Sequence, residues 1–128
     1  MNRPLVLVVD DDPDILDAIC DILDAEGYRV SRARHGQEAL EQVDSERPDV
    51  ILLDLMMPVM DGVAFSHALR QRPAVSDVPI VVISADGNPQ RAAAVGAAGY
   101  LAKPFDIDAL LAHVAGITRD VGAPRPGT

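Results

Sequence analysis

Several residue types are scarce in this chain of 128 residues, and each scarcity excludes a class of protein. The single cysteine, Cys20, excludes an internal disulfide and agrees with a reducing cytoplasm. No apolar run approaches the roughly 18 residues of a membrane span, so we expect a cytoplasmic chain with no membrane contact. Basic residues are outnumbered, and the net charge of -9 argues against direct nucleic-acid binding.

Aromatic residues are also rare, so the core has to be built from aliphatic side chains. They make up 3% of the sequence, against 48% for all hydrophobic residues. The length predicts one domain that is large enough to bury a substantial core. Two prolines and two glycines follow residue 120. We therefore expect one domain over 3–118 and a flexible tail, or the start of a linker, over 119–128.

Short apolar runs alternate with helical patterns, which is typical of a parallel sheet covered by helices on both faces. The runs predict five strands, over residues 5–9, 30–33, 50–53, 80–83 and 99–102. Helices are expected from Pro13, from Gly36, over 63–72, over 89–95 and after a cap at Asp106. Right-handed crossovers leave few arrangements for such a chain. We expect an α/β fold, a doubly wound, flavodoxin-like (βα)5 sandwich of three layers with the sheet order 2-1-3-4-5.

The first helix and the histidines allow more local predictions. Asp12 is a suitable cap for the first helix. The buried stripe of this helix is expected to contain Ile15, Ile19, Ile22 and Leu23, and Cys20 is expected close to its inner side as a small core residue. Three histidines lie in no motif and are expected at the surface, namely His35, His67 and His113.

Polar residues end four of the predicted strands, and they are chemically complementary. The first strand ends on Asp10 and Asp11, the third on Asp54, the fourth on Ser84 and the fifth on Lys103, the only lysine. The carboxyl ends of parallel strands share one edge of the sheet, where such folds bind ligands. Carboxylates held together repel each other and favour a cation, and oxygen ligands of this kind suit Mg²⁺. The sequence therefore predicts a site for Mg²⁺ and phosphate at this edge.

In order and spacing, these segments resemble the receiver domain of two-component response regulators. The resemblance extends from residue 3 to about 118 and rests mainly on four matches, Val8–Asp11, Asp54–Pro58 with Asp61 and Gly62, Ser84–Ala85, and Lys103–Phe105. Secondary matches are Gly27–Val30, Gly36–Leu40 and Arg47–Asp49. The resemblance implies a signalling domain, not an enzyme, that accepts a phosphoryl group from phosphohistidine in the presence of Mg²⁺ and then switches conformation. The implied donor is a sensor histidine kinase or a histidine phosphotransfer protein. A homodimer or an output protein is a further partner that the family allows.

The resemblance also assigns the acidic residues. Asp54 resembles the phosphoacceptor, and Asp11, Asp54 and the main-chain carbonyl of Met56 resemble the Mg²⁺ ligands. Asp10 resembles a further acid that helps to hold the ion, mainly through water. Met56 has no polar side chain to orient water near the acceptor, so we expect a longer phospho-lifetime than in chemotaxis-type regulators.

The remaining family positions concern phosphoryl binding and switching. Lys103 resembles the residue that grips a phosphoryl oxygen, Ser84 the switch hydroxyl, and Ala85 the neighbour whose N–H faces the phosphoryl group. Tyr100 resembles the aromatic switch that turns inward on activation. The family tends to have a cis bond before the residue that corresponds to Pro104. The fourth helical segment, over 89–95, is shorter than the family usually has, so we expect a short or poorly ordered helix and an atypical output surface.

Other functions fit the same residues less well. A Ca²⁺ loop beginning at Asp10 would need glycine where Ile15 stands. A haloacid-dehalogenase-like phosphohydrolase would also use Asp54, but it would need a second acid in place of Met56 and a longer chain. A flavin-binding protein would need a phosphate loop after the first strand, and an unphosphorylated interaction domain would not need the intact site.

The stretch from Asp10 through Asp24, both included, contains seven aspartates and no basic residue. Such a run is usually a solvated face. The family resemblance indicates instead a docking surface for a basic patch on the phosphodonor. The sequence leaves both interpretations of this acidic run open.

The sequence is also compatible both with a free-standing regulator and with a receiver domain that is part of a longer protein.

Overall fold

A parallel sheet of five strands forms the centre of the protein. The computed structural model describes residues 3–54, 62–84, 90, 93, 95–103 and 105–118. The strands are β1 (Leu5–Val9), β2 (Arg29–Ala33), β3 (Val50–Asp54), β4 (Ile80–Ser84) and β5 (Gly99–Ala102). Their order across the sheet is β2-β1-β3-β4-β5, which confirms the predicted order.

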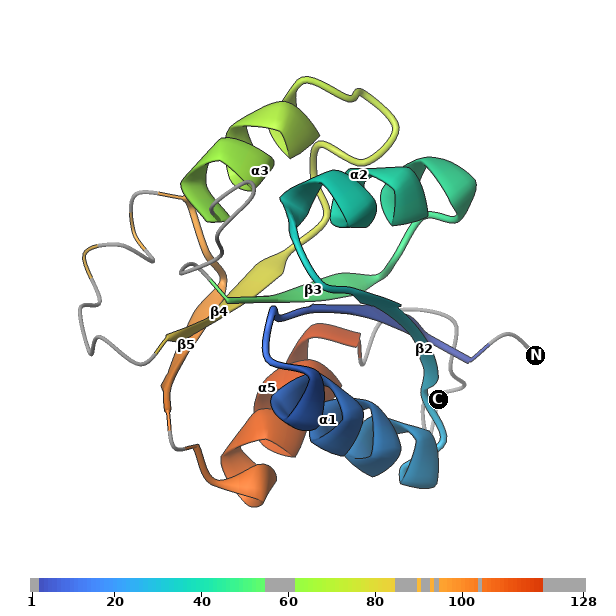
Figure 1. Ribbon diagram of the computed structural model, residues 1–128, viewed down its shortest axis with the longest axis vertical. Coiled ribbons are helices and arrows are strands. Elements are labelled where there is room, and N and C mark those ends of the chain that lie inside the picture. The colour runs from blue at the N-terminus through green and yellow to red at the C-terminus, as the bar shows by residue number, and fades with distance from the viewer. Residues whose placement is uncertain are drawn as a thin grey trace.

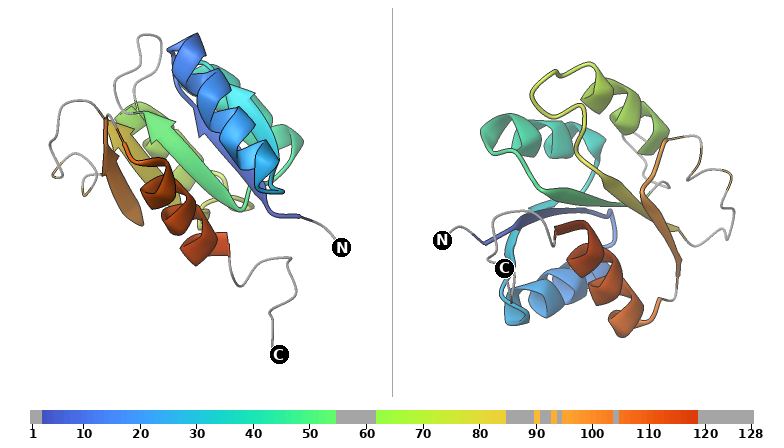
Figure 2. Two further views of the ribbon diagram at one scale, coloured as in Figure 1. Left: turned by 90° about the horizontal axis from the view of Figure 1, so that it is seen from below. Right: turned by 180° about the vertical axis from the view of Figure 1, so that it is seen from behind.

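Four helices of the described part cover the two faces of the sheet. α1 (Pro13–Ala25) and α5 (Ile107–Thr118) lie on one face, and α2 (Gly36–Ser45) and α3 (Gly62–Arg70) lie on the other (Figure 1). Figure 2 shows the same three layers from two further directions, and the predicted flavodoxin-like sandwich is confirmed. Most of the helix expected over 89–95 lies outside the described residues. None of the described helices is long and apolar enough to cross a membrane.

Each face of the sheet has its own hydrophobic core. Beneath α2 and α3, strand residues such as Leu7 and Ile51 pack with Phe65, whose ring is fully buried. Beneath α1 and α5, residues that point to the opposite face, such as Val8 and Leu52, form the second core. Fully burying one such side chain contributes about 1.5–3 kcal/mol. Because β1, β3 and β4 are buried along their whole length, their ends are held firmly in place.

The buried stripe of α1 differs from the predicted one. Asp12 caps the helix as expected, since its carboxylate accepts hydrogen bonds from the main-chain N–H groups of Asp14 at 2.9 Å and Ile15 at 3.4 Å. Ile15 and Ile22 are only half-buried. The buried residues are Leu16, Ile19, Cys20 and Leu23. Both the predicted and the observed stripe follow the helical spacing of three and four residues, so the spacing alone does not decide which side of α1 faces the sheet.

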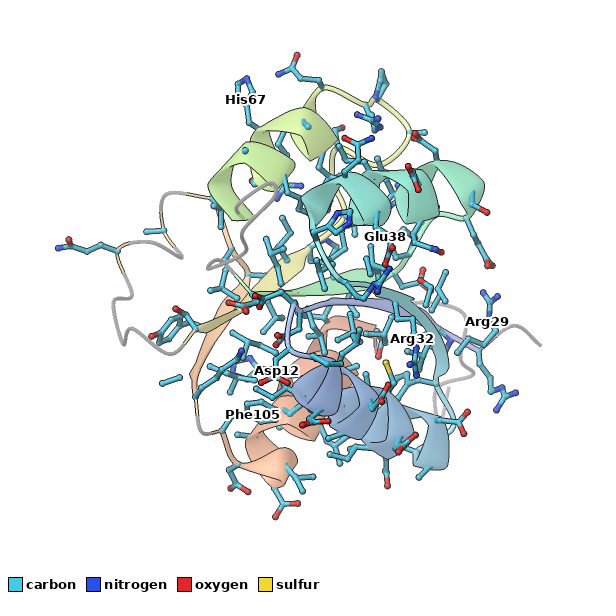
Figure 3. The ribbon with its side chains drawn as sticks, viewed as in Figure 1. Asp12, Arg29, Arg32, Glu38, His67 and Phe105 are labelled. Carbon is cyan, nitrogen blue, oxygen red and sulfur yellow. The ribbon has the colours of Figure 1, made fainter. Side chains whose placement is uncertain are left out.

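Two of the histidines predicted at the surface are half-buried. Nδ1 of His35 accepts a hydrogen bond from the main-chain N–H of Glu38 at 3.2 Å and so caps α2. His113 lies on the backbone of β5, where a Cβ on Gly99 would be 2.8 Å from its Nδ1. His67 is exposed and points away from α3, as Figure 3 shows. The predictions for His35 and His113 were wrong for the same reason. Both imidazoles contact backbone atoms, and no residue pattern reveals such contacts.

Candidate functional site

The sheet brings the acidic residues together at its carboxyl edge. β1 and β3 run side by side, with Val9 opposite Leu53, so Asp10 and Asp54 follow at neighbouring strand ends. The carboxylates of Asp10, Asp11 and Asp54 offer oxygen atoms that all lie within 4.8 Å of one another. Asp10 and Asp54 are buried, whereas Asp11 is exposed to solvent.

The ammonium group of Lys103 lies between two of these carboxylates. Its Nζ donates to Asp10 Oδ2 at 2.9 Å and to Asp54 Oδ2 at 3.4 Å. The main-chain N–H of Lys103 donates to the carbonyl of Ser84 at 2.9 Å, which ties it to the end of β4. These groups are shielded from water, with exposed fractions of 1% for Asp10, 5% for Asp54 and 15% for the lysine side chain.

The two contacts raise the pKa of Lys103 above the usual lysine value. Burial is the largest single influence and lowers the pKa, because it disfavours the charged form. The hydrogen bond and charge of Asp10, together with those of Asp54, outweigh burial. Lys103 is therefore charged at neutral pH and offsets part of the negative charge at this edge.

Asp10 is held at both of its carboxylate oxygens. Oδ2 accepts from Lys103, while Oδ1 accepts from the main-chain N–H of Asp12 at 2.9 Å in an Asx turn. The N–H of Asp10 itself donates to the carbonyl of Ala33, at the end of β2, at 3.1 Å. Sequence reasoning missed the contact from Asp12. The Asp-x-Asp spacing at the junction of strand and helix is the signal that could have indicated it.

The other predicted site residues lie partly within the described structure. Ser84 is fully buried at the end of β4, on the same edge of the sheet. Tyr100 is half-buried against the core beneath α2 and α3, and its hydroxyl is buried with no hydrogen-bond partner among the described residues. Met56, Ala85 and Pro104 lie outside the described residues, so their assigned roles remain predictions.

The acidic cluster fits a hard divalent cation. Its oxygen atoms are the type of ligand that Mg²⁺ takes, and Mg²⁺ uses one or two carboxylates while it keeps several waters. The exposure of Asp11 leaves room for a hydrated ion, and the burial of Asp54 strengthens its attraction to positive charge. The residues present therefore suit Mg²⁺.

Known proteins are similar to this chain in sequence. The family described as "Response regulator receiver domain" matches residues 6–115. The chain belongs to this family. The transcriptional regulatory protein PrrA of Mycobacterium leprae is 43% identical over 126 residues, which cover 96% of this chain and 53% of PrrA. The DNA-binding dual master transcriptional regulator RpaA of Synechocystis is 36% identical over 119 residues, which cover 91% of this chain and 49% of RpaA.

Solved receiver structures have the same fold. The chemotaxis protein CheY4 of Vibrio cholerae has a TM-score of 0.84 and 36% identity, over 90% of this chain and 98% of CheY4. The receiver domain of the Francisella response regulator 1452 has a TM-score of 0.85 and 32% identity, over 94% of this chain and 100% of that domain. This response regulator receiver domain is a signalling module.

PrrA and RpaA are longer than this chain, which spans about half of the length of each. RpaA is named as a DNA-binding regulator. The comparisons therefore lend no support to the expectation that nucleic acid is not a partner.

Proposed function

We propose that this receiver domain accepts a phosphoryl group on Asp54 from a phosphohistidine donor, with Mg²⁺ bound at the acidic cluster. The observation that carries the proposal is the position of Lys103. Its ammonium lies 3.4 Å from Asp54 Oδ2, at a sheet edge where three carboxylates converge. A carboxylate can act as the nucleophile in such a transfer, and phosphoryl transfer depends mainly on positioning and charge neutralisation.

In the transfer step, a carboxylate oxygen of Asp54 forms a bond to phosphorus. The bond between phosphorus and the donor imidazole nitrogen breaks, and its electron pair stays on the nitrogen. The product adds roughly -1.5 to -2 of charge at this edge. Lys103 offsets part of this charge, and its ammonium binds a phosphoryl oxygen. Mg²⁺, when bound by Asp11 and Asp54 with the help of Asp10, supplies further charge neutralisation.

Ser84 and Tyr100 are the residues that we propose to convert this charge into a conformational change. The buried hydroxyl of Ser84 lies at the same edge, where it can donate to a phosphoryl oxygen. β4 and β5 pair in parallel, with Ser84 opposite Ala102 and Val82 opposite Tyr100. A movement of Ser84 would therefore also move the paired backbone of β5. The buried hydroxyl of Tyr100 has no partner among the described residues and would gain from a new acceptor.

The outer face of α1 supports docking of a basic phosphodonor surface. It carries four exposed aspartates, Asp14, Asp17, Asp21 and Asp24. Of these four, Asp17 alone forms an ion pair within the described residues, with Arg32 at 2.6 Å. Like charges three and four residues apart on a helix repel each other, and basic residues of a partner would relieve this repulsion. We propose a sensor histidine kinase or a histidine phosphotransfer protein as that partner.

Mass spectrometry of the intact protein tests phosphoryl acceptance. With Mg²⁺ and a small donor such as acetyl phosphate, the wild-type chain should gain one phosphoryl group. The Asp54→Asn variant should gain none, and a chelator should prevent the gain in the wild-type chain. Asp24→Asn makes the same change of charge on the outer face of α1 and serves as the control. Modification of Asp54→Asn, or steady hydrolysis of a generic phosphomonoester, would contradict the proposal.

A further inference from the structure

A continuous series of hydrogen bonds links the first turn of α1 to Asp54. The carboxylate of Asp12 accepts from the main-chain N–H of Asp14 at 2.9 Å. The main-chain N–H of Asp12 donates to Asp10 Oδ1 at 2.9 Å. Asp10 Oδ2 accepts from Lys103 at 2.9 Å, and the same ammonium reaches Asp54 at 3.4 Å. Figure 3 shows Asp12 where the chain passes from the sheet into α1.

We propose that Asp12 is a positioning residue for this site. Its cap on α1 holds the direction of its own N–H, and through this N–H it sets the orientation of the Asp10 carboxylate and of the Lys103 ammonium. The inference rests on the proposed function, because it concerns the same Mg²⁺ and phosphoryl site. The described side-chain contacts of Asp12 go to the helix and not to Lys103 or Asp54.

Three contacts hold the backbone of Asp12. The residue has the extended conformation that a capping position requires, with φ -87° and ψ 111°. Its carbonyl accepts from the N–H of Leu16 at 2.9 Å, its side chain caps the helix, and its N–H binds Asp10. Without the side-chain cap, the carbonyl of residue 12 keeps its contact with Leu16, but the N–H of residue 12 is held less firmly in its direction toward Asp10.

The burial of Asp10 makes it sensitive to this N–H. With 1% of its surface exposed, Asp10 has little water to replace a lost donor. If Oδ1 loses the N–H of Asp12, the carboxylate gains by turning both oxygens toward Lys103. Such a turn draws the ammonium away from Asp54, whose contact is already the longer one, at 3.4 Å against 2.9 Å. A change at an exposed capping residue thereby reaches the phosphoacceptor.

Two substitutions of Asp12 separate positioning from charge. Asp12→Asn removes the negative charge but keeps a side chain that caps helices well, whereas Asp12→Ala removes both. Asp106→Ala is the matched control, because Asp106 is an exposed aspartate that accepts from the N–H of Asp108 at 3.2 Å at the start of α5. The control thus loses the same charge and a cap of the same kind, on another helix.

Three measurements are needed on each variant, all on the folded, metal-free protein. Calorimetric titration gives the dissociation constant for Mg²⁺, hydrogen exchange reports on the main-chain N–H of residue 12, and urea unfolding gives the stability. We expect Asp12→Ala to bind Mg²⁺ at least roughly threefold more weakly than Asp12→Asn, and its N–H at residue 12 to exchange at least about fivefold faster. Asp106→Ala should lower the urea midpoint by about as much as Asp12→Ala does. It should change neither the dissociation constant for Mg²⁺ nor the exchange rate of the main-chain N–H of residue 12.

Equal Mg²⁺ affinities and equal exchange rates in Asp12→Asn and Asp12→Ala would overturn the proposal. An equal loss of Mg²⁺ affinity in Asp106→Ala would do the same, since it would show a general effect of a lost cap. Failure of the proposed function gives a different result. In that case the wild-type chain takes no phosphoryl group, while the difference in exchange between the two Asp12 variants persists.

Discussion

Replacing Lys103 by methionine is the most direct test of how this site is held together. Lys103→Met keeps most of the apolar stem but removes the ammonium from between Asp10 and Asp54, which are 1% and 5% exposed. At an effective dielectric constant of about 20, two unit charges 4 Å apart attract by about 4 kcal/mol. Desolvation of the ammonium offsets part of this attraction, but the two carboxylates remain buried without their cation. Breaking a buried ion pair in this way costs about 3–5 kcal/mol.

We therefore expect Lys103→Met to lower the free energy of unfolding by about 3 kcal/mol at neutral pH, measured by urea unfolding in the absence of metal. Addition of Mg²⁺ should restore part of the loss, because a ligand that binds the native state stabilises it. Arg34→Met is the control. The exposed guanidinium of Arg34 lies 3.6 Å from the carboxylate of Glu38. Removal of this guanidinium should therefore lower the free energy of unfolding by only about 0–1 kcal/mol. A loss no larger for Lys103→Met than for Arg34→Met would refute the reasoning.

The pH dependence of the same comparison follows from the raised pKa of Lys103. A group whose pKa is raised by folding stabilises the native state fully below its pKa in the unfolded chain. The stability advantage of the wild type over Lys103→Met should therefore be constant from neutral pH up to the ordinary lysine value of 10.5 and fall as the pH rises through the raised value. An advantage that instead grew above this pH would contradict the contacts described here.

The remaining predictions concern packing and helix capping, and urea unfolding measures all of them. Gly99→Ala should destabilise the protein by about 1–3 kcal/mol, because the added Cβ would lie 2.8 Å from Nδ1 of His113. Adding His113→Ala to this variant should remove most of the destabilisation. His35→Ala should cost about 1 kcal/mol through loss of the contact to the N–H of Glu38, whereas His35→Asn should restore the cap. Phe65→Ala should cost about 3–5 kcal/mol, because the ring is fully buried.

The architecture could be predicted because its signals are local. Continuous apolar runs indicated strands that are covered on both faces, and the structure buries β1, β3 and β4 throughout. Asp12 and Asp106 marked helix starts, and the structure shows both as acceptors from main-chain N–H groups. The sheet order followed from the crossover rule and from the family resemblance, and the observed order agrees.

Details that depend on contacts between distant segments could not be predicted. The stripe of α1 was placed on Ile15 and Ile22, which are only half-buried, whereas the buried Leu16 was not predicted. The half-buried positions of His35 and His113 follow from backbone atoms of α2 and β5. Neither the residue types nor their spacing carries this information, because the burial of a side chain depends on what another element places against it.

The sequence by itself determined which residues end the strands, and the parallel arrangement of those strands required the polar ones to share one edge. The tertiary structure alone decided how these residues meet. Lys103 lies closer to Asp10 than to Asp54, and Asp10 is anchored in turn by the N–H of Asp12. These pairings join residues up to 93 positions apart, so they are set by strand register and by side-chain orientation in the folded chain, which a linear pattern does not encode.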